Sequence, residues 1–418
     1  MAYKQVLLGD FFKFEKGLGY KGEFLVEDSE VAMIGMDSHE EGGGYKEASE
    51  KPYSGPYKPE HVAETGDVIF AATEQGFGLL ASPLMVPESE KFQTFIYSHH
   101  LLKAFVKKEG FLPEYLYNLY RVEKYRDKAA YGDVGSTVRA LPSVVLEEQL
   151  VPLPDVETQE SINAVIALID QQIENNKSLA KNLEALAQAM YRSWFVDFEP
   201  VHAKARGEKP FGMDDETAEL FPDSFEESEL GLIPKGWKVN TLKEACDIKQ
   251  GRYLSPSQMS LKPSEGVSVP VIGGNGILGY TSNSTFEFGV PLITCRGSKC
   301  GLLQWGSFPS WISNNAMAVT FKHDPKDNGF LAMLFNSLKF DDVITGSAQP
   351  QITITHLGLL DFVMPPINVI RKYTQLQSVI RSKTDNMLNQ NDSLNDLINV
   401  LLAHFIDRPN DLPLEILK

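Results

Sequence analysis

A chain of 418 residues is long for a single hydrophobic core, so its length predicts two or three domains. Its 43% hydrophobic and 23% charged residues are typical of a globular protein and exclude an intrinsically disordered one. Acidic side chains outnumber basic ones by 56 to 39, and the resulting net charge of −17 argues at first sight against binding to nucleic acid.

The charge is distributed unevenly along the chain. Residues 1–198 hold 19 basic and 31 acidic side chains (net −12), residues 199–230 hold 3 and 10 (net −7), and residues 231–418 hold 17 and 15 (net +2). The acidic average therefore does not exclude DNA as a ligand. On charge alone, the isolated chain is expected to bind DNA weakly.

The number of cysteines and the first residues of the sequence indicate a cellular compartment. Cys246, Cys295 and Cys300 are too few for a disulfide framework, and without the spacing of a zinc knuckle they are expected to be small buried thiols. Lys4 and Asp10 interrupt the apolar residues that a signal peptide would need. No run of about 18 apolar residues follows. We therefore expect a cytoplasmic protein without a membrane span.

Two kinds of sequence alternate along the chain. Residues 1–155 and 231–366 carry short β-branched and aromatic runs broken by Gly and Pro, which is typical of β-rich domains. Each is followed by a long segment without Gly or Pro, at 156–198 and 367–407, whose apolar spacing predicts a long helix.

Two remaining segments carry no such pattern. Residues 199–230 are acidic and contain Pro and Gly, so we interpret them as a solvated linker, with an interaction segment or a mimic of nucleic-acid charge as the alternative. Residues 408–418 form a short tail.

The second half of the chain repeats the first. The sequence GSTVRALPSVVLEEQLVPLP from Gly135 aligns without a gap on GSAQPQITITHLGLLDFVMP from Gly346. Earlier in each half, HHLLKAFV at His99 stands opposite NNAMAVTF at Asn314. A repeat of this length indicates a duplicated domain pair and not a solenoid.

Both predicted helices carry one narrow apolar seam, which at roughly 60 Å of length requires a partner helix. Polar residues interrupt the seam near the middle, at Gln172 and Asn176 in one helix and at Lys383 and Gln390 in the other. The seam residues are Ile162, Val165, Ile169, Leu183, Leu186 and Met190 in the first helix, and Tyr373, Leu376, Ile380, Met387, Leu394, Leu397 and Leu401 in the second. We predict an α+β fold: two tandem, pseudo-two-fold-related, β-rich domains held apart by two long antiparallel helices that form a coiled coil.

Motifs for catalysis are mostly absent from the sequence. It contains no GxxxxGK[ST] phosphate loop, no GxGxxG that follows a strand and opens a helix, and no HExxH. His99 and His100 would point to opposite faces of a strand, so we interpret them as ordinary surface or core residues. Asp223, Asp247 and Lys249 match a metal-dependent nuclease pattern only loosely. The sequence therefore predicts a chain without catalytic or metal-binding residues.

Loops at equivalent places in both halves carry residues suited to DNA. Arg, Gln and Asn can read base edges, while Ser, Thr, Lys and Tyr suit phosphate contacts. The candidate DNA-binding residues of the first domain are Lys16, Tyr20, Lys21, Thr73, Gln75, Ser136, Thr137 and Arg139. Those of the second domain are Arg252, Tyr253, Asn275, Arg296, Ser298, Lys299, Ser347, Gln349 and Gln351.

Several segments, in the same order along the chain, resemble the DNA-specificity subunit of type I restriction-modification systems. LIPKGWKVNTLKEACDIKQG from Leu232 resembles the opening of a target-recognition domain of that family, and VIGGNGILGYTSNS, LITCRGSKCG and WISNNAMAV resemble its interior. LEALAQAMYRSWFVDFEPVHAKARG from Leu183 is similar to the end of its central helix. The first domain departs from the pattern, since EEGGGYKEASEKPYSGPYKP takes the place of the usual hairpin.

This resemblance implies a function in DNA recognition without catalysis. Each target-recognition domain would bind one half of a bipartite site in double-stranded DNA, and the helices would set the spacing. Two methyltransferase subunits would dock on the chain and carry S-adenosylmethionine, and restriction subunits that use ATP and Mg²⁺ could join them. No cofactor is expected in this chain.

Two alternatives stay open at this point. The acidic charge and the coiled-coil seam also fit a scaffold protein with no role in nucleic-acid binding. The residues Asp223, Asp247 and Lys249 leave a stand-alone metal-dependent nuclease as the other alternative.

Overall fold

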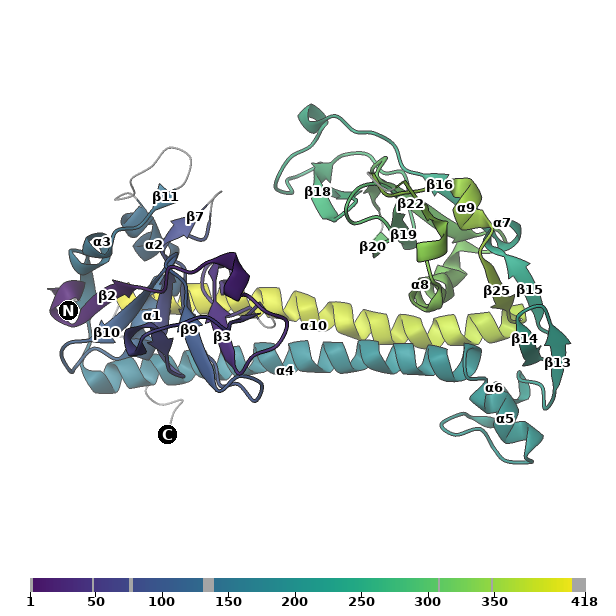
Figure 1. Cartoon of the computed structure of the whole chain (residues 1–418), viewed down its shortest axis with the longest axis horizontal. Helices are drawn as coiled ribbons and strands as arrows, with labels where there is room; N and C mark the ends of the chain where they lie inside the picture. The colour runs from purple at the N-terminus through teal and green to yellow at the C-terminus, as the bar shows by residue number, and fades with distance from the viewer. Residues whose placement is uncertain are drawn as a thin grey trace. The chain divides into compact units, whose positions relative to one another are not determined.

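The computed structural model describes residues 3–46, 49–74, 78–130, 139–306, 309–346 and 349–407. The chain folds into two compact units, the first comprising Met1–Asn176 with Asn389–Lys418 and the second comprising Lys177–Leu388. Two long helices, α4 (Val156–Phe195) and α10 (Ile367–Asp407), each contribute to both units and are drawn in teal and yellow in Figure 1.

Before α4, the described part of the first unit consists of short strands and short helices. Its elements before α4 are β1 (Lys4–Leu7), β2 (Phe12–Lys16), β3 (Val31–Ile34), β4 (Lys51–Pro52), β5 (Val62–Ala63), β6 (Val68–Ala71), β7 (Thr73–Glu74), β8 (Pro83–Met85), β9 (Thr94–Tyr97), β10 (Leu101–Val106), α1 (Pro113–Arg121), α2 (Glu123–Ala130), β11 (Arg139–Ala140), α3 (Ser143–Glu147) and β12 (Leu150–Leu153). Among the described residues, β2-β10-β6-β8 form one four-stranded sheet and β4-β3-β9-β5 another. The strand β2 shows why these sequences form sheets, because its alternating Phe12 and Phe14 are buried while Lys13 is exposed.

The second unit follows the same plan. Its elements are α5 (Glu199–Ala205), α6 (Asp215–Glu219), β13 (Phe225–Ser228), β14 (Gly231–Pro234), β15 (Lys238–Thr241), α7 (Leu242–Ala245), β16 (Cys246–Gln250), β17 (Val269–Gly273), β18 (Gly276–Thr281), β19 (Val290–Thr294), β20 (Leu303–Gly306), β21 (Trp311–Ile312), β22 (Ala316–Phe321), α8 (Asn328–Ser337), β23 (Ile344–Thr345), β24 (Gln351–Ile352), α9 (Ile354–Gly358) and β25 (Asp361–Met364). In this part of the chain, β16-β22-β19-β20 form a four-stranded sheet and β18-β17-β21 a three-stranded one.

The strand orders of the two units correspond. The order β2-β10-β6-β8 matches β16-β22-β19-β20, and β1 paired with β12 matches β15 paired with β25. The parallel pair of β3 and β9 matches the parallel pair of β17 and β21. The structure therefore confirms the internal repeat that the sequence predicts.

The two long helices pack against each other within each unit (Figure 1). In the first unit, the Asn176 side chain donates a hydrogen bond of 2.8 Å to the side-chain oxygen of Asn391. In the second, the Tyr373 hydroxyl donates one of 3.0 Å to the backbone carbonyl of Ala187. Higher residue numbers on α4 thus meet lower numbers on α10, which confirms the predicted antiparallel pairing. No helix in the described part of the chain has the length and hydropathy needed to cross a bilayer.

The buried seam of these helices follows a spacing of three and four residues, but several of its residues lie one position beyond the predicted ones. The buried residues include Gln159, Ile162, Ile166, Ile173, Asn176, Ala180 and Ala187 on α4, and Tyr373, Gln377, Thr384, Asn391, Ile398, Leu402 and Phe405 on α10. Among the predicted seam residues, Ile162 and Tyr373 are fully buried. Those that are partly buried are Val165, Ile169, Leu183, Met190, Leu376, Ile380, Met387, Leu394 and Leu401.

The placement of Leu186 and Leu397 in the seam is wrong, since they are 50% and 43% exposed. Their neighbours Ala187 and Ile398 are buried instead. The small alanine side chain allows α10 to approach closely enough for the Tyr373 hydroxyl to reach the backbone of α4. The polar seam position Asn176 is buried as predicted, whereas Gln172, Lys383 and Gln390 are exposed.

The acidic segment 199–230, interpreted above as a solvated linker, is folded against the second unit. It contains α5, α6 and β13, and its Val201 and Phe221 are buried in the same core as Trp194. The Phe221 and Trp194 rings meet edge to face, with centroids 5.3 Å apart. The acidic composition of the segment concealed these few apolar residues, which are enough to fix it in place.

Candidate nucleic-acid interface

The first predicted DNA-binding loop of each domain leaves its strand at a glycine that no other residue can replace without collision. A Cβ on Gly17 would lie 2.1 Å from the Tyr97 carbonyl oxygen, and one on Gly251 would lie 2.2 Å from that of Ser313. The next residue donates a backbone hydrogen bond of 2.8 Å in both cases, Leu18 to Tyr97 and Arg252 to Ile312. The same backbone contact thus begins the loop in both domains.

A second repeated contact joins the other loops. In the first domain, Ala72 after β6 donates its backbone N–H to the carbonyl of His100 (2.9 Å), and Leu141 donates to Ala72 (2.8 Å). In the second domain, Cys295 after β19 donates to Asn315 (2.9 Å), and Ile352 donates to Cys295 (3.1 Å). In each domain, three chain segments therefore meet at one point.

The side chains of the first domain gather around this point. The Thr73 hydroxyl lies 3.0 Å from Nδ1 of His100, and the Tyr20 ring is 6.3 Å from the ring of His99. Lys16 ends β2 opposite Leu102, and the backbone of Arg139 on β11 is in register with that of Glu74 on β7. Lys21 is exposed and lies 3.6 Å from the Glu23 carboxylate. The predicted residues Gln75, Ser136 and Thr137 lie outside the described residues.

The second domain brings its predicted residues to the corresponding place. Arg296 and Gln351 form an isolated antiparallel β-bridge, which matches the pairing of Thr73 with Ala140 in the first domain. The side chains that project from these loops to solvent are Arg252, Tyr253, Asn275, Arg296, Ser298, Lys299 and Gln349, with Gln351 half-buried. Ser347 lies outside the described residues.

The hairpin tip that carries Asn275 is fastened to the same loops. Gln304 accepts a hydrogen bond from the backbone of Gly276 (2.8 Å) and donates to the carbonyl of Gly273 (3.0 Å). The Thr294 hydroxyl donates to the Gly274 carbonyl at 2.7 Å. Because Thr294 ends β19 just before Arg296, the hairpin and the Arg296 loop are held as one surface.

The histidines His99 and His100 belong to this site, although the sequence analysis interpreted them as ordinary residues. They occupy the turn between β9 and β10, and Asn314 and Asn315 occupy the corresponding turn of the second domain. The signal that could have identified them was the repeat alignment, which already set His99 opposite Asn314.

The nuclease alternative finds no support in the geometry. Asp247 and Lys249 are exposed on β16, and Asp223 precedes β13. Among the residues that the structure describes, no group of three or more His, Cys, Asp or Glu side chains is placed to hold a metal ion. Burial raises the pKa of the Cys295 thiol beside the predicted DNA-binding loops, which disfavours the thiolate form.

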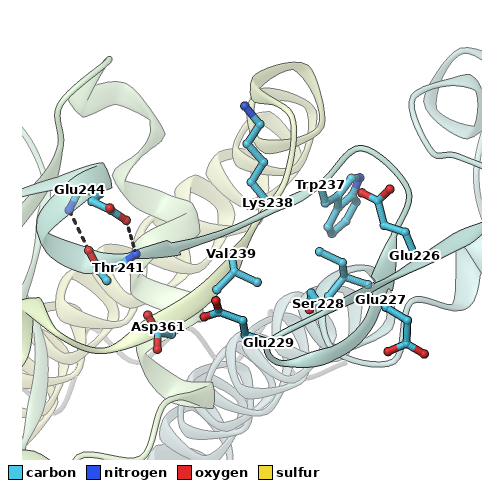
Figure 2. Close-up of a pocket in the computed structure, with 11 residues that line it drawn as sticks. Glu226, Glu227, Ser228, Glu229, Trp237, Lys238, Val239, Thr241, Glu244 and Asp361 are labelled. Atoms are coloured by element: carbon cyan, nitrogen blue, oxygen red, sulfur yellow. Dashed lines mark hydrogen bonds between the residues drawn. The ribbon is translucent and has the colours of Figure 1, made fainter.

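A pocket of about 550 Å³ in the second unit has the wrong charge for phosphate (Figure 2). Its acidic lining residues are Glu226, Glu227, Glu229, Glu244 and Asp361. Glu244 forms the capping box of α7, in which it accepts from the backbone of Thr241 at 2.9 Å. The acidic lining of the pocket therefore repels a nucleic-acid backbone, unlike the loop surface described above.

Comparison with known proteins decides the family. Residues 234–403 match the model of the type I restriction modification DNA specificity domain. The chain is 48% identical over 322 residues to the HindI specificity subunit of Haemophilus influenzae, a match that covers 61% of this chain and 68% of that protein. This chain belongs to the type I restriction-modification specificity subunits.

Other members of the family match shorter stretches or match less closely. The MjaIX specificity subunit of Methanocaldococcus jannaschii is 31% identical over 146 residues, which span 35% of this chain and 30% of that protein. A crystal structure of the type I restriction-modification S subunit from M. genitalium covers 96% of this chain and 95% of its own, with 14% identity and a TM-score of 0.49. The assignment rests on the sequence matches. As a specificity subunit, the chain is a non-catalytic component that recognises DNA.

Proposed function

We propose that each β-rich domain of this specificity subunit reads one half of a bipartite DNA site through the loops described above. The observation that carries the proposal is the repeated backbone frame with different side chains on it. Thr73 and His100 in the first domain stand where Arg296 and Asn315 stand in the second. Two domains that recognise different half-sites need the same backbone frame to position them on the duplex. They also need different side chains to contact the bases.

The side chains divide into two roles in this proposal. Arg296, Gln351 and Asn275 can each make two parallel hydrogen bonds to the major-groove edge of a base. Lys16, Lys21, Lys299 and Ser298 would contact phosphate oxygens and position the domain without reading sequence.

The paired helices would act as the spacer between the two half-sites. Domains that approach the same face of a duplex need half-sites about 34 Å apart, or a multiple of this distance. The Asn176–Asn391 hydrogen bond supports a fixed register, because a buried polar pair in a coiled-coil seam disfavours displaced alignments.

The exposed faces of the same helices would dock two methyltransferase subunits, through which restriction subunits could join. Large apolar side chains stand exposed outside the seam, at Leu168, Leu179 and Leu186 on α4 and at Val379, Leu388, Leu397 and Val400 on α10. S-adenosylmethionine, ATP and Mg²⁺ would then belong to the partner subunits. The free thiols of Cys246, Cys295 and Cys300 suit a cytoplasmic complex.

The experiment that tests the proposal is sequencing of methylated adenines in cells with and without this chain. We expect a bipartite methylated motif that disappears when the gene is deleted and returns when it is restored. An unchanged set of methylated sites would contradict the proposal and favour a scaffold without DNA specificity.

A further inference from the structure

We infer that His99 and His100 form a proton-dependent contact between the first domain and its DNA half-site, so that binding of that half-site strengthens as pH falls. The inference deepens the proposed function and rests on it. Nothing equivalent is expected in the second domain.

The two histidines lie in a turn that backbone hydrogen bonds tie to two loops of the first domain. His99 donates its backbone N–H to Leu18 (2.9 Å), and the carbonyl of His100 accepts from Ala72 (2.9 Å). The two imidazole centroids are only 3.9 Å apart. Both rings thus point from a fixed turn toward the loops that carry Tyr20 and Thr73.

The surroundings of the His100 ring disfavour its charged form while no ligand is bound. Burial lowers the pKa of His100, and the neighbouring His99 and Lys16 lower it further. The elements that meet this turn also carry Glu15 on β2, Tyr20 after it, Lys103 on β10 and Arg139 on β11. A neighbouring imidazole and a lysine therefore disfavour a second positive charge on His100.

A bound phosphate reverses this balance. A negative phosphate oxygen near the turn stabilises protonated imidazole and raises its pKa toward or above the ordinary value of about 6.5. The DNA complex therefore holds more protons than the free protein, and binding takes protons up. Because the bound state has the higher pKa, the added affinity is fully present below the pKa of the free protein and is lost as pH rises through the pKa of the complex.

The second domain provides an internal control for this effect. Asn314 and Asn315 occupy the corresponding turn, and amide side chains do not titrate between pH 5 and 8. The carbonyl of Asn314 accepts a 2.9 Å hydrogen bond from the Gln250 side chain, so this turn is also held in place. A His99→Asn, His100→Asn double variant copies a pair that the repeated frame already accepts.

The test uses the full chain assembled with its methyltransferase subunits and the duplex that carries its methylated bipartite motif. Binding affinity is measured from pH 8 to pH 6 at constant ionic strength, against the same duplex with the first or the second half scrambled. We expect the wild-type preference for an intact first half to rise about tenfold, as uptake of about half a proton predicts. The preference for an intact second half should stay constant.

Variants separate protonation from a structural role. The double asparagine variant should lose the pH dependence and bind at pH 6 as the wild type does at pH 8. His99→Lys, which keeps a positive charge throughout this range, should bind tightly at both pH values. His61→Asn, at an exposed turn of the same unit, should retain the wild-type pH dependence.

The outcomes distinguish the inference from the proposed function. If wild type prefers the intact duplex but the double variant keeps the same pH dependence, the histidine contact is refuted and DNA recognition stands. If wild type does not distinguish the intact from the scrambled duplexes at any pH, the proposed function fails and the inference falls with it. Thermal melting of each variant shows whether it is folded, and His99→Asn alone replaces the double variant if the latter is not.

Discussion

The first and second units place the same backbone contacts at the ends of the same strands, but the short helix that packs on the long helices makes different specific contacts in each. In the first unit, Arg121 on α1 forms a two-pronged ion pair with Asp170 on α4, with N–O distances of 2.7 and 2.9 Å. In the second, Phe330 on α8 packs on Phe195 of α4 and on Tyr373 of α10, with ring centroids 5.0 and 6.4 Å apart.

The comparison shows which backbone features both units use to hold their loops. The glycine at the end of the first sheet strand, the backbone hydrogen bonds between loops and the strand order recur in both units. An apolar core joins α1 or α8 to both long helices in each unit, but the Arg121–Asp170 ion pair, the Phe330 ring contacts and the side chains at the loop surface do not recur. The loop side chains and some contacts with the long helices can therefore differ while the backbone contacts between the loops stay the same.

The largest effect is expected from removing the aromatic attachment of the second unit. Phe330→Ala should destabilise that unit by about 4 kcal/mol, because it deletes a fully buried ring from a packed cluster. All four tryptophans, Trp194, Trp237, Trp305 and Trp311, lie in the second unit, so denaturant unfolding followed by tryptophan fluorescence reports on it. Phe211→Ala is the matched control, since Phe211 is fully exposed and should change nothing. A destabilisation below about 1 kcal/mol for Phe330→Ala would contradict the attachment.

A smaller destabilisation is expected from breaking the shared frame itself. Gly17→Ala should destabilise the first unit by about 3 kcal/mol, because its Cβ would meet the backbone of Tyr97 and not a side chain that can move. Faster hydrogen exchange in β2 and β10 would show this destabilisation. Gly19→Ala, where no atom lies within 4 Å of the added Cβ, should leave the exchange unchanged. Equal exchange in both variants would mean that the glycine is not required.

The polar attachment of the first unit should contribute less than the aromatic one. Arg121→Ala should cost about 2 kcal/mol, because Arg121 is buried while Asp170 remains partly open to water. Lys58→Ala, which removes an exposed pair with Glu60, should cost less than about 0.5 kcal/mol. Thermal unfolding of both variants at low and high salt measures the difference. Equal destabilisation by the two substitutions would show that the Arg121 pair is as weak as a surface pair.

The smallest effects concern specificity and leave stability unchanged. Arg296→Ala and Gln351→Ala should each weaken discrimination in the second half-site by about 1–2 kcal/mol for each base that the side chain reads. Competition binding with singly substituted duplexes measures this effect base by base. Arg206→Ala, at an exposed position paired with Glu208, should preserve discrimination. Full discrimination at every base after both substitutions would remove Arg296 and Gln351 from the reading surface.

Much of the fold could be predicted because the sequence repeats. The alignment of Gly135 with Gly346 indicated two copies of one domain, and the segments without Gly or Pro located α4 and α10. The seam was harder to predict, because a heptad assigned from large apolar residues selects Leu186. Helices in close contact favour a small residue such as Ala187 at that place.

The candidate site was predicted in part for a similar reason. Loop residues such as Arg296 and Thr73 could be found because their chemistry suits DNA at equivalent places in the repeat. His99 and His100 were interpreted as ordinary residues, because the role of a histidine depends on its neighbours in space. These neighbours, such as Thr73 beside His100, are known only from the folded turn. The folded state of 199–230 was hidden by its acidic residues, since Val201 and Phe221 are few in number but buried.

The central claim, that two separable domains each read one half of a bipartite site, is tested most directly by domain exchange. Residues 1–155, which end where α4 begins, are replaced by the corresponding domain of another specificity subunit with both long helices intact. Sequencing of methylated adenines should then show a new first half-site, an unchanged second half-site and an unchanged spacing between them. A change in both half-sites, or in neither, would contradict the account.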